Sequence, residues 1–239
     1  MQKYLLEVER ELKKLADSAY KNSNEKFAIP RSVGIRAKRL TDRLIKGFTF
    51  SKLPDHEQWK IWNFIFRNSR LHEAQMAALR FAEDRVQKNE KREWNFLRGW
   101  VDFVDNWAHS DVLSKIYSFL LERHPDLILP QLKKWNQSKN SWKQRTSIIS
   151  LIYYASIKRK APPIKTVLEL VEPLIKNRHK YVAKAVGWTL RESHNLYPKE
   201  TLAFITAHIR DLAPDSFSYA TEKISKKEKD ALKRLRIKS

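Results

Sequence analysis

An acidic residue in a strongly basic chain is the first candidate for chemistry. Residues 106 to 111 read NWAHSD, so Asp111 follows Trp107 by four residues. On a helix, this spacing puts the carboxylate and the indole on one face. A carboxylate can stabilise a developing cation or align a water molecule, and an electron-rich indole can hold a cationic group. If a helix begins at Ser110, however, Asp111 is simply a first-turn acid favoured by the helix dipole.

The charge of the chain indicates a polyanionic partner. Its 239 residues include 48 Lys and Arg against 27 Asp and Glu, a formal net charge of +21. Nucleic acids and anionic membrane surfaces both attract such a protein. No stretch approaches the roughly 20 apolar residues of a membrane span, so a membrane role would be peripheral. The N-terminal sequence MQKYLLEVERELKKLADSAY alternates charge with Leu and does not resemble a secretion signal, and we therefore expect a cytoplasmic protein.

Several classes of site find no support in the sequence. Cysteine is absent, which excludes disulfides, thiolate zinc sites and cysteine nucleophiles. The 7 His residues are scattered without HxH or HExxH spacing, and no glycine-rich phosphate loop is present. We expect neither a metal ion nor another cofactor.

Apolar residues recur at helical spacing along most of the chain, and Gly occurs only 4 times. This pattern predicts an all-α fold in which residues 1–239 form one domain. The expected helices cover residues 2–21, 33–46, 54–69, 71–88, 92–105, 109–123, 126–137, 141–159, 163–177, 180–195, 198–211 and 215–235.

Three segments repeat a common scheme, in which a polar turn leads into mixed small and large apolar residues. They are HEAQMAALRFAEDR (72–85), SWKQRTSIISLIYYA (141–155) and KYVAKAVGWTLRES (180–193). Each follows another amphipathic helix, which predicts an α-solenoid of stacked antiparallel helix pairs. Its second helices would line a concave basic surface that can cradle a duplex. The alternative is a bundle in which these are unrelated core helices.

A second candidate lies in the last of these segments. Trp188 precedes Arg191 by three residues, which places an indole and a guanidinium on one helix face. A packed Trp beside a surface Arg is an equally good interpretation of this spacing. Trp59 and Trp62, also three residues apart, are expected to form a buried stripe instead of a binding site.

Six segments together resemble the AlkD-like DNA alkylation repair family of HEAT-like-repeat DNA glycosylases. They occur in the family's order and at similar spacing, over most of the chain: VGIRAKR (33–39), EAQMAAL (73–79), NWAHSD (106–111), RHPDLI (123–128), SWKQR (141–145) and KAVGWTLRE (184–192).

The resemblance implies a monomeric, metal-free enzyme of base excision repair. Such enzymes hydrolyse the N-glycosidic bond of cationic N3- and N7-alkylated purines, such as 3-methyladenine and 7-methylguanine, in duplex DNA. They do not draw the damaged base into a pocket. The resemblance assigns the catalytic carboxylate to Asp111 and the two site tryptophans to Trp107 and Trp188.

The same resemblance implies a set of DNA-binding residues. Arg145 and Arg191 would hold phosphates beside the lesion by bidentate hydrogen bonds. Arg36 in VGIRAKR and Lys184 in KAVGWTLRE are further candidates for contacts with DNA. The family's aromatic residue near the N-terminus, which approaches the lesion, corresponds to either Tyr20 or Phe27.

The sequence also departs from the family pattern. Ala108 stands where the family usually has Asp directly after the first Trp, and Ala37 and Lys38 replace a hydroxyl-Pro pair. These changes leave a noncatalytic binder of damaged or branched DNA as an alternative to a glycosylase. A solenoid scaffold for acidic protein partners is a third possibility that the charge permits.

Overall fold

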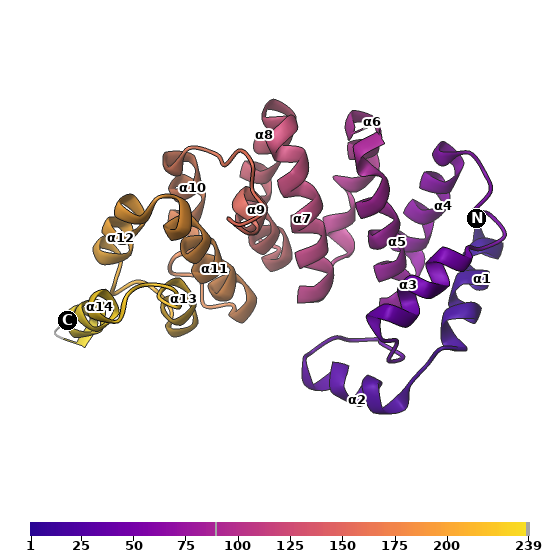
Figure 1. The fold of residues 1–239 in the computed structure, drawn as a ribbon, viewed down its shortest axis with the longest axis horizontal. Coiled ribbons are helices and arrows are strands. Elements are labelled where there is room, and N and C mark those ends of the chain that lie inside the picture. The colour runs from indigo at the N-terminus through magenta and orange to yellow at the C-terminus, as the bar shows by residue number, and fades with distance from the viewer. Residues whose placement is uncertain (89, 238–239) are drawn as a thin grey trace. The chain divides into compact units, whose positions relative to one another are not determined.

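The computed structural model describes residues 1–88 and 90–237, and all regular structure in these two ranges is helical (Figure 1). The predicted all-α fold is therefore confirmed. The chain divides into two compact units, Met1–Val112 and Leu113–Ser239, and the boundary falls within helix α7 (Trp107–Arg123). The prediction of one domain over residues 1–239 stays a prediction.

The first unit is built around an aromatic core. Trp59 and Trp62 are 1% and 2% exposed, so the predicted buried stripe is confirmed. Trp59 packs edge-on against Phe81, and the Phe66 ring stacks on Trp100 at 4.3 Å between centroids. The helices of this unit that precede α7 are α1 (Gln2–Lys13), α2 (Ser18–Lys26), α3 (Ala37–Lys46), α4 (Asp55–Asn68), α5 (His72–Arg85) and α6 (Glu90–Leu97), with short 3-10 helices η1 (Val86–Lys88) and η2 (Trp100–Phe103).

The second unit stacks helices in two layers. Helix α11 packs between α9 and α13, while α8 covers α9, and α10 and α12 cover α11 (Figure 1). After α7 this unit contains α8 (Pro125–Asn136), α9 (Ser141–Ile152), α10 (Ile164–Val171), the 3-10 helix η3 (Glu172–Leu174), α11 (Lys180–Leu196), α12 (Pro198–Ala207), α13 (Pro214–Ala220) and α14 (Lys226–Ile237).

The three repeated sequence segments correspond to α5, α9 and α11. Each is the second helix of a pair, because α5 packs on α4, α9 on α8 and α11 on α10. Helices α11 and α13 approach closely at Gly187, where a Cβ atom would lie 2.5 Å from the carbonyl oxygen of Ser216. A glycine here lets the two backbones come together.

Four predicted helices are wrong in their extent. Residues 92–105 form α6, which ends at Leu97, and the separate 3-10 helix η2. Residues 2–21 form two helices because the Asp17 side chain accepts a hydrogen bond from the Tyr20 N–H and caps α2. Residues 215–235 also form two helices. There, Ser225 accepts from the Glu228 N–H and caps α14.

The fourth of these helices was predicted to cover residues 141–159. Instead it ends at Ile152, because Tyr153 takes a positive φ of 62°. The predicted start at residue 109 is also late, since α7 begins at Trp107. The predicted start at residue 33 is early, since α3 begins at Ala37, and the helix predicted to reach residue 211 ends at Ala207.

Candidate functional site

The first two turns of α7 carry Trp107 and Asp111. The Asn106 side-chain oxygen accepts a hydrogen bond from the His109 N–H (3.0 Å), which caps the helix and starts it at Trp107. Asp111 is therefore the fifth helical residue and does not lie in the first turn, and the interpretation of Asp111 as a first-turn acid is wrong. Both Trp107 and Asp111 are partly exposed.

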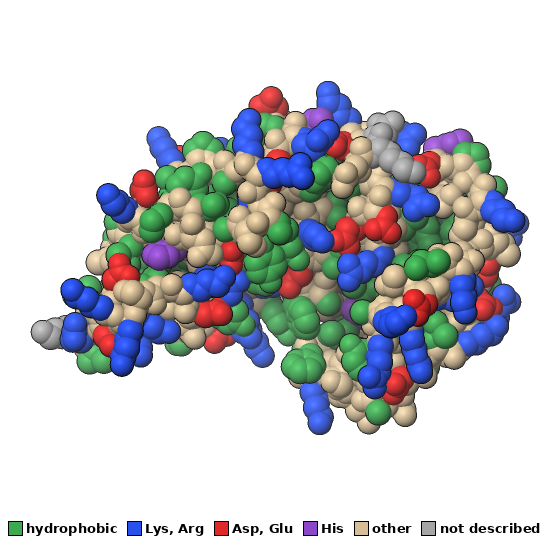
Figure 2. Space-filling model, viewed as in Figure 1, with side chains coloured by type: hydrophobic (Ala, Val, Ile, Leu, Met, Phe, Trp, Pro, Cys, Tyr) green, Lys and Arg blue, Asp and Glu red, His purple; other side chains and the backbone are tan. Residues whose placement is uncertain are grey.

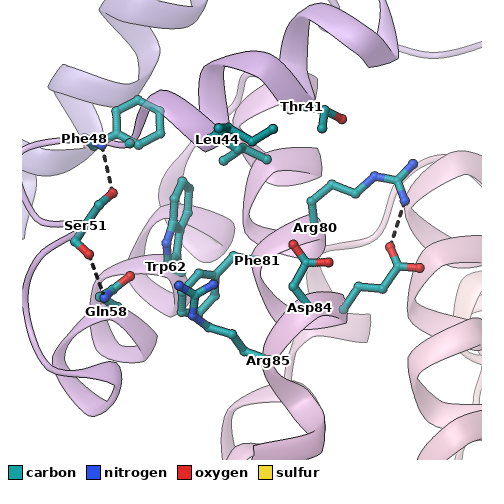
Figure 3. Close-up of a pocket in the computed structure, with 13 residues that line it drawn as sticks. Thr41, Leu44, Phe48, Ser51, Gln58, Trp62, Arg80, Phe81, Asp84 and Arg85 are labelled. Atoms are coloured by element: carbon teal, nitrogen blue, oxygen red, sulfur yellow. Dashed lines mark hydrogen bonds and ion pairs between the residues drawn. The ribbon is translucent and has the colours of Figure 1, made fainter.

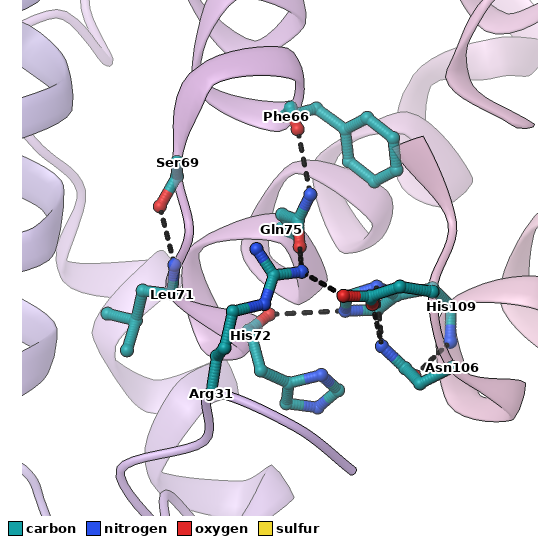
Figure 4. Close-up of polar contacts among 9 residues, drawn as sticks. Arg31, Phe66, Ser69, Leu71, His72, Gln75, Asn106 and His109 are labelled. Atoms are coloured by element: carbon teal, nitrogen blue, oxygen red, sulfur yellow. Dashed lines mark hydrogen bonds and ion pairs between the residues drawn. The ribbon is translucent and has the colours of Figure 1, made fainter. Parts of the chain in front are cut away.

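A buried polar network lies under this turn (Figure 4). The Asn106 amide nitrogen lies 2.9 Å from both Asp105 Oδ1 and His109 Nδ1. Because the amide donates, His109 Nδ1 accepts and its Nε2 carries the proton, 3.3 Å from the carbonyl oxygen of His72. The two imidazoles stack at 4.5 Å between centroids. Burial lowers the pKa of both His72 and His109, well below 6.5 for His109, so the network is built on neutral rings.

Arg31 joins this network to the segment that follows α2. Its guanidinium pairs with Asp105 and lies 3.4 Å from Gln75 Oε1, as Figure 4 shows in part. Its carbonyl oxygen accepts the His72 N–H at 3.2 Å, and its backbone takes a positive φ of 59°. Three hydrogen-bonded or ion-paired neighbours thus hold this short irregular segment against α5 and the residues that precede α7.

That segment brings an exposed aromatic residue beside Trp107. The Phe27 side chain is 64% exposed, and its carbonyl oxygen accepts the indole N–H of Trp107 at 2.8 Å. Tyr20, the other N-terminal candidate, instead lies under the Arg36 guanidinium, 5.6 Å from its ring centre. Phe27 is therefore the aromatic residue that adjoins Trp107.

Trp188 lies in α11 and is also partly exposed. Its indole N–H donates to the carbonyl oxygen of Tyr153 at 2.7 Å, and the Tyr154 ring lies 5.0 Å from it between centroids. The Arg191 guanidinium lies 5.4 Å from the Trp188 ring centre, so these two side chains meet as their spacing predicts. Both site tryptophans thus have their N–H bonded to a backbone carbonyl, which fixes the orientation of each ring.

The two predicted phosphate-binding arginines face the protein interior. Arg145 is 4% exposed, and its guanidinium donates to the Tyr181 carbonyl oxygen at 2.8 Å. Arg191 is 9% exposed and pairs with Glu192 at 2.8 Å and Glu222 at 2.7 Å. Their expected contacts with phosphate stay predictions, and such contacts would have to compete with these protein partners.

Arg36 and Lys184 are more accessible. The Arg36 side chain is 64% exposed, and Arg36 directly precedes α3. Figure 2 shows Lys and Arg side chains gathered over α3. Exposed basic residues of this stretch also include Lys38 and Arg39. Lys184 is half-buried and lies 5.7 Å from the Tyr219 ring centre.

A buried carboxylate positions the backbone that leads to Arg36. Glu73, 2% exposed, accepts hydrogen bonds from the N–H groups of residues 33–35 at 3.0–3.3 Å. Gly34 makes this loop possible, because its φ is +83° and a Cβ atom would lie 2.1 Å from the Asp17 carbonyl oxygen. The EAQMAAL and VGIRAKR segments are therefore joined by one side chain.

A separate cavity of about 620 Å³ lies among α3, α4 and α5 (Figure 3). Phe48, Trp62 and Phe81 form its apolar part. Arg80 at its rim donates to Glu83 at 2.7 Å. None of the site residues predicted from the sequence lines this cavity.

The family of the chain follows from its match to a protein-family model. The family model described as DNA alkylation repair enzyme matches residues 8–224. The chain belongs to the DNA alkylation repair enzyme family. The resemblance found in the sequence is thereby confirmed, and DNA is the partner that membership in this family implies. All seven predicted site residues lie within the matched range.

Two solved structures share the fold of this family member. A predicted DNA alkylation repair enzyme from Enterococcus faecalis is 16% identical, with a TM-score of 0.73, over 87% of this chain and 96% of that one. AlkD2 from Streptococcus mutans is 20% identical, with a TM-score of 0.52, over 92% and 97%. The comparison with curated proteins finds no match. The helical-repeat fold expected from the sequence is confirmed.

The structure adds residues to the site of this alkylation repair protein that the sequence did not single out. Asn106 could have been found, since Asn before a helical segment is a capping signal. Glu73 could also have been found, because a carboxylate in the apolar run EAQMAAL needs hydrogen-bond partners if it is buried. Tyr153 and Arg31 gave no signal, because neither residue type indicates a positive φ.

The described residues, 1–88 and 90–237, contain neither a membrane-spanning helix nor a cluster of metal ligands. None of their helices is long and apolar enough to cross a membrane. No group of three or more His, Asp or Glu side chains in these ranges is arranged to hold a metal ion.

Proposed function

We propose that the protein is a monofunctional DNA glycosylase that releases cationic N3- and N7-alkylated purines from duplex DNA. The single observation that supports this most directly is the position of Asp111 on α7, one helical turn after Trp107. Its carboxylate is partly exposed, one helical turn after a Trp107 indole whose N–H is fixed by Phe27. A partly exposed carboxylate beside a fixed aromatic ring suits stabilisation of a cation.

The chemistry needs a carboxylate and no general acid. An alkylated purine already carries positive charge, so it leaves with the electron pair of the glycosidic bond and becomes neutral. The sugar becomes an oxocarbenium ion, whose charge Asp111 would stabilise in the transition state. A water molecule then bonds to C1′ and gives up a proton, and Asp111 would align this water and accept the proton.

Trp107 and Trp188 would hold the damaged nucleotide. Each indole has its N–H bonded to a backbone carbonyl, which fixes the ring that would contact the sugar or the cationic base. Contacts between a cation and an aromatic face contribute roughly 0.5–2 kcal/mol. We propose that these contacts act on a base that is not drawn into a pocket.

The four basic site residues would divide into two roles. Arg36 and Lys184 are exposed or half-buried, which suits direct contact with phosphates. Arg145 and Arg191 are buried and bonded to protein groups, which suits a role in positioning α9 and α11. Either arginine could bind a phosphate only by breaking a bond to its present partner. The concave basic surface predicted from the sequence stays part of this proposal.

We further propose that the protein is a monomer that works in the cytoplasm without a metal ion or other cofactor. The hydrolysis described above assigns each step to a side chain of this protein or to water.

One assay tests the proposed activity. The protein is incubated with duplexes that contain a single 7-methylguanine or 3-methyladenine, and the released free base is measured. We expect release from both duplexes and none from unmodified DNA. Absence of release under conditions in which the protein binds these duplexes would contradict the glycosylase proposal.

A noncatalytic binder of damaged or branched DNA is the second candidate. Ala108 favours it, because Ala stands where the family usually has an acid and supplies no carboxylate beside Trp107. This candidate predicts tight binding of modified duplexes without any release of base, so the same assay separates the two functions.

A further inference from the structure

The cavity among α3, α4 and α5 contains an arginine whose hydrogen-bond donors are mostly unused. Arg85 lines this cavity, and its side chain is 31% exposed. Its Nε lies 3.4 Å from Asp55 Oδ1, which is long for a hydrogen bond. Within residues 1–88 and 90–237, this guanidinium donates no other hydrogen bond. A guanidinium carries five N–H donors, so the fork of its two terminal nitrogens stays open to water or to a ligand.

Aromatic packing fixes this guanidinium in place. Its central carbon lies 4.6 Å from the Phe81 ring centre (Figure 3). Phe81 is 6% exposed and packs on Trp62 at 5.7 Å between centroids, and Trp62 packs on Phe48 at the same distance. A planar cation that is held on a buried ring loses less freedom on binding an anion than a mobile side chain does.

Helix α3 gives the same cavity an apolar edge. It buries Leu40 in the core, whereas Leu44 and Ile45, one turn later, line the cavity. Ile45 is 79% exposed. A ligand with an apolar body would therefore cover side chains that now face water.

The other charges of the cavity limit the charge of a ligand. Arg80 donates to Glu83 at 2.7 Å, so its charge is already paired. Asp84 is exposed and lines the same cavity. Its negative charge opposes a polyanion, such as DNA or a nucleotide, more strongly than it opposes a ligand with one carboxylate. Arg85 is therefore the group that suits an anion, and a single negative charge suits the cavity best.

We propose that this cavity is a binding site for a small organic acid with one carboxylate and an aromatic or branched aliphatic body. The Arg85 fork binds the carboxylate through two parallel hydrogen bonds, and the body lies against Leu44 and Ile45. The volume of about 620 Å³ is in the usual range of sites for small molecules. The inference does not rest on the proposed glycosylase function, because none of these residues belongs to that site.

The test compares three probes with one body. At neutral pH, 3-phenylpropionate is an anion, 3-phenylpropanol is neutral and 3-phenylpropylamine is a cation. Binding to the full-length protein is followed by the methyl NMR signal of Ile45, which an Ile45→Val variant assigns. We expect the acid to shift this signal to saturation, with an affinity about 10-fold or more above that of the alcohol, the effect of hydrogen bonds to a charged group. The amine should bind most weakly.

Three results with these probes would overturn the site. The first is an Ile45 signal that the acid does not shift at millimolar concentration. The second is equal affinity for the acid and the alcohol, which would mean that only the apolar body is bound. The third is tighter binding of the amine, which would mean that Asp84 selects the ligand.

Substitutions of Arg85 test the assignment of the carboxylate. Arg85→Lys keeps the charge but loses the fork, so it should lower the affinity for the acid about 10-fold and leave that for the alcohol unchanged. Arg85→Met should remove the preference for the acid. Arg123→Met is the matched control, because Arg123 lies 5.6 Å from the Phe119 ring centre and outside the cavity. Melting temperatures show whether each variant is folded. A preference for the acid that survives in Arg85→Met would contradict the proposal.

Asp84→Asn gives a test of the opposite sign and changes only an exposed side chain. Loss of this charge should strengthen binding of the acid by about 2- to 4-fold, the scale of one unit charge several ångströms away in water. Weaker binding of the acid in Asp84→Asn would contradict the proposed placement of the carboxylate. Unmodified duplex should not displace the acid. Displacement would show that DNA occupies the cavity and would overturn the site.

Discussion

His109 is the residue on which the start of α7 rests. It is fully buried, and its backbone N–H and its ring both bond to Asn106. Its ring stacks on His72, and the one carboxylate near it, Asp105, whose Oδ1 lies 3.9 Å from Nδ1, is already paired with Arg31. The neutral imidazole therefore supports the turn that carries Trp107 and Asp111.

Acid should weaken this support. Burial lowers the pKa of His109 well below 6.5, and the neighbouring His72 acts in the same direction. A histidine with a lowered pKa contributes its full stability above its unfolded pKa of about 6.5, and that stability is lost as the pH falls further. We expect the free energy of unfolding in urea to be lower at pH 5.5 than at pH 7.5. His109→Gln should reduce this difference, while the exposed His56→Gln should not. An identical pH dependence in all three proteins would contradict this account.

Substitutions of Arg145 and Lys184 should have different effects, the first mainly on stability and the second mainly on DNA binding. Arg145→Ala leaves the Tyr181 carbonyl without its donor, so we expect a loss of about 1–3 kcal/mol in the free energy of unfolding. Any loss of DNA affinity should be alike for different flanking sequences. Lys184→Ala should leave stability nearly unchanged and reduce the salt slope of DNA binding by about 1. Urea unfolding and DNA titrations measure both effects. If Arg145→Ala keeps full stability and loses affinity, Arg145 contacts phosphate directly.

At the scale of helices, Gly187 sets how closely α11 and α13 pack. A methyl group at this position would meet the Ser216 carbonyl oxygen at 2.5 Å and the Tyr219 Cβ at 2.6 Å. Gly187→Ala should therefore lower the free energy of unfolding by about 1–3 kcal/mol, despite the higher helix propensity of Ala. Gly99→Ala is the matched control, because its Cβ would meet only the Phe96 carbonyl oxygen, at 3.8 Å. Equal melting temperatures for the two variants would show that α13 shifts at little cost.

The sequence predicts helices well where apolar periodicity is strong, as in α4, α5 and α11. It fails where a single side chain caps the backbone. Asp17 and Ser225 each divide a continuous amphipathic pattern into two helices, and the Ser225–Glu228 spacing is a capping signal that could have been used. The turn at Tyr153 had no such signal, because Tyr is not a residue type that indicates a positive φ.

The candidate site was predictable in part, for a similar reason. Trp107 and Asp111 belong to one helix, so their spacing alone places them on one face, and Trp188 and Arg191 meet in the same way. The direction in which Arg145 points depends on α11, through the Tyr181 carbonyl. No periodicity within α9 could reveal that its guanidinium faces the interior.

For the whole molecule, the net charge of +21 should dominate binding to DNA. Lys and Arg side chains that contact phosphates release counterions, so the logarithm of the affinity should fall linearly with the logarithm of the salt concentration. Fluorescence anisotropy with an unmodified duplex at several salt concentrations measures the slope. An affinity that does not change with salt would contradict this expectation.

The C-terminal helix should add to this slope. Helix α14 buries Leu232 and anchors Arg236 on the Leu212 carbonyl oxygen at 2.7 Å, while its other basic residues are mostly exposed. Truncation at Ser225 should therefore make the salt slope shallower without abolishing binding. An unchanged slope would mean that α14 is only a solvated end helix.

The central claim is that Asp111 stabilises the cationic sugar during base release. Asp111→Asn should keep the melting temperature and the DNA affinity, because the two side chains have nearly the same shape. Release of 7-methylguanine in a single turnover should fall by roughly 10²- to 10³-fold, the effect of losing one preorganised electrostatic group. Some release should remain, since the alkylated purine is itself a good leaving group. The exposed Asp102→Asn is the matched control and should release base at the original rate. Unchanged release by Asp111→Asn would contradict the account.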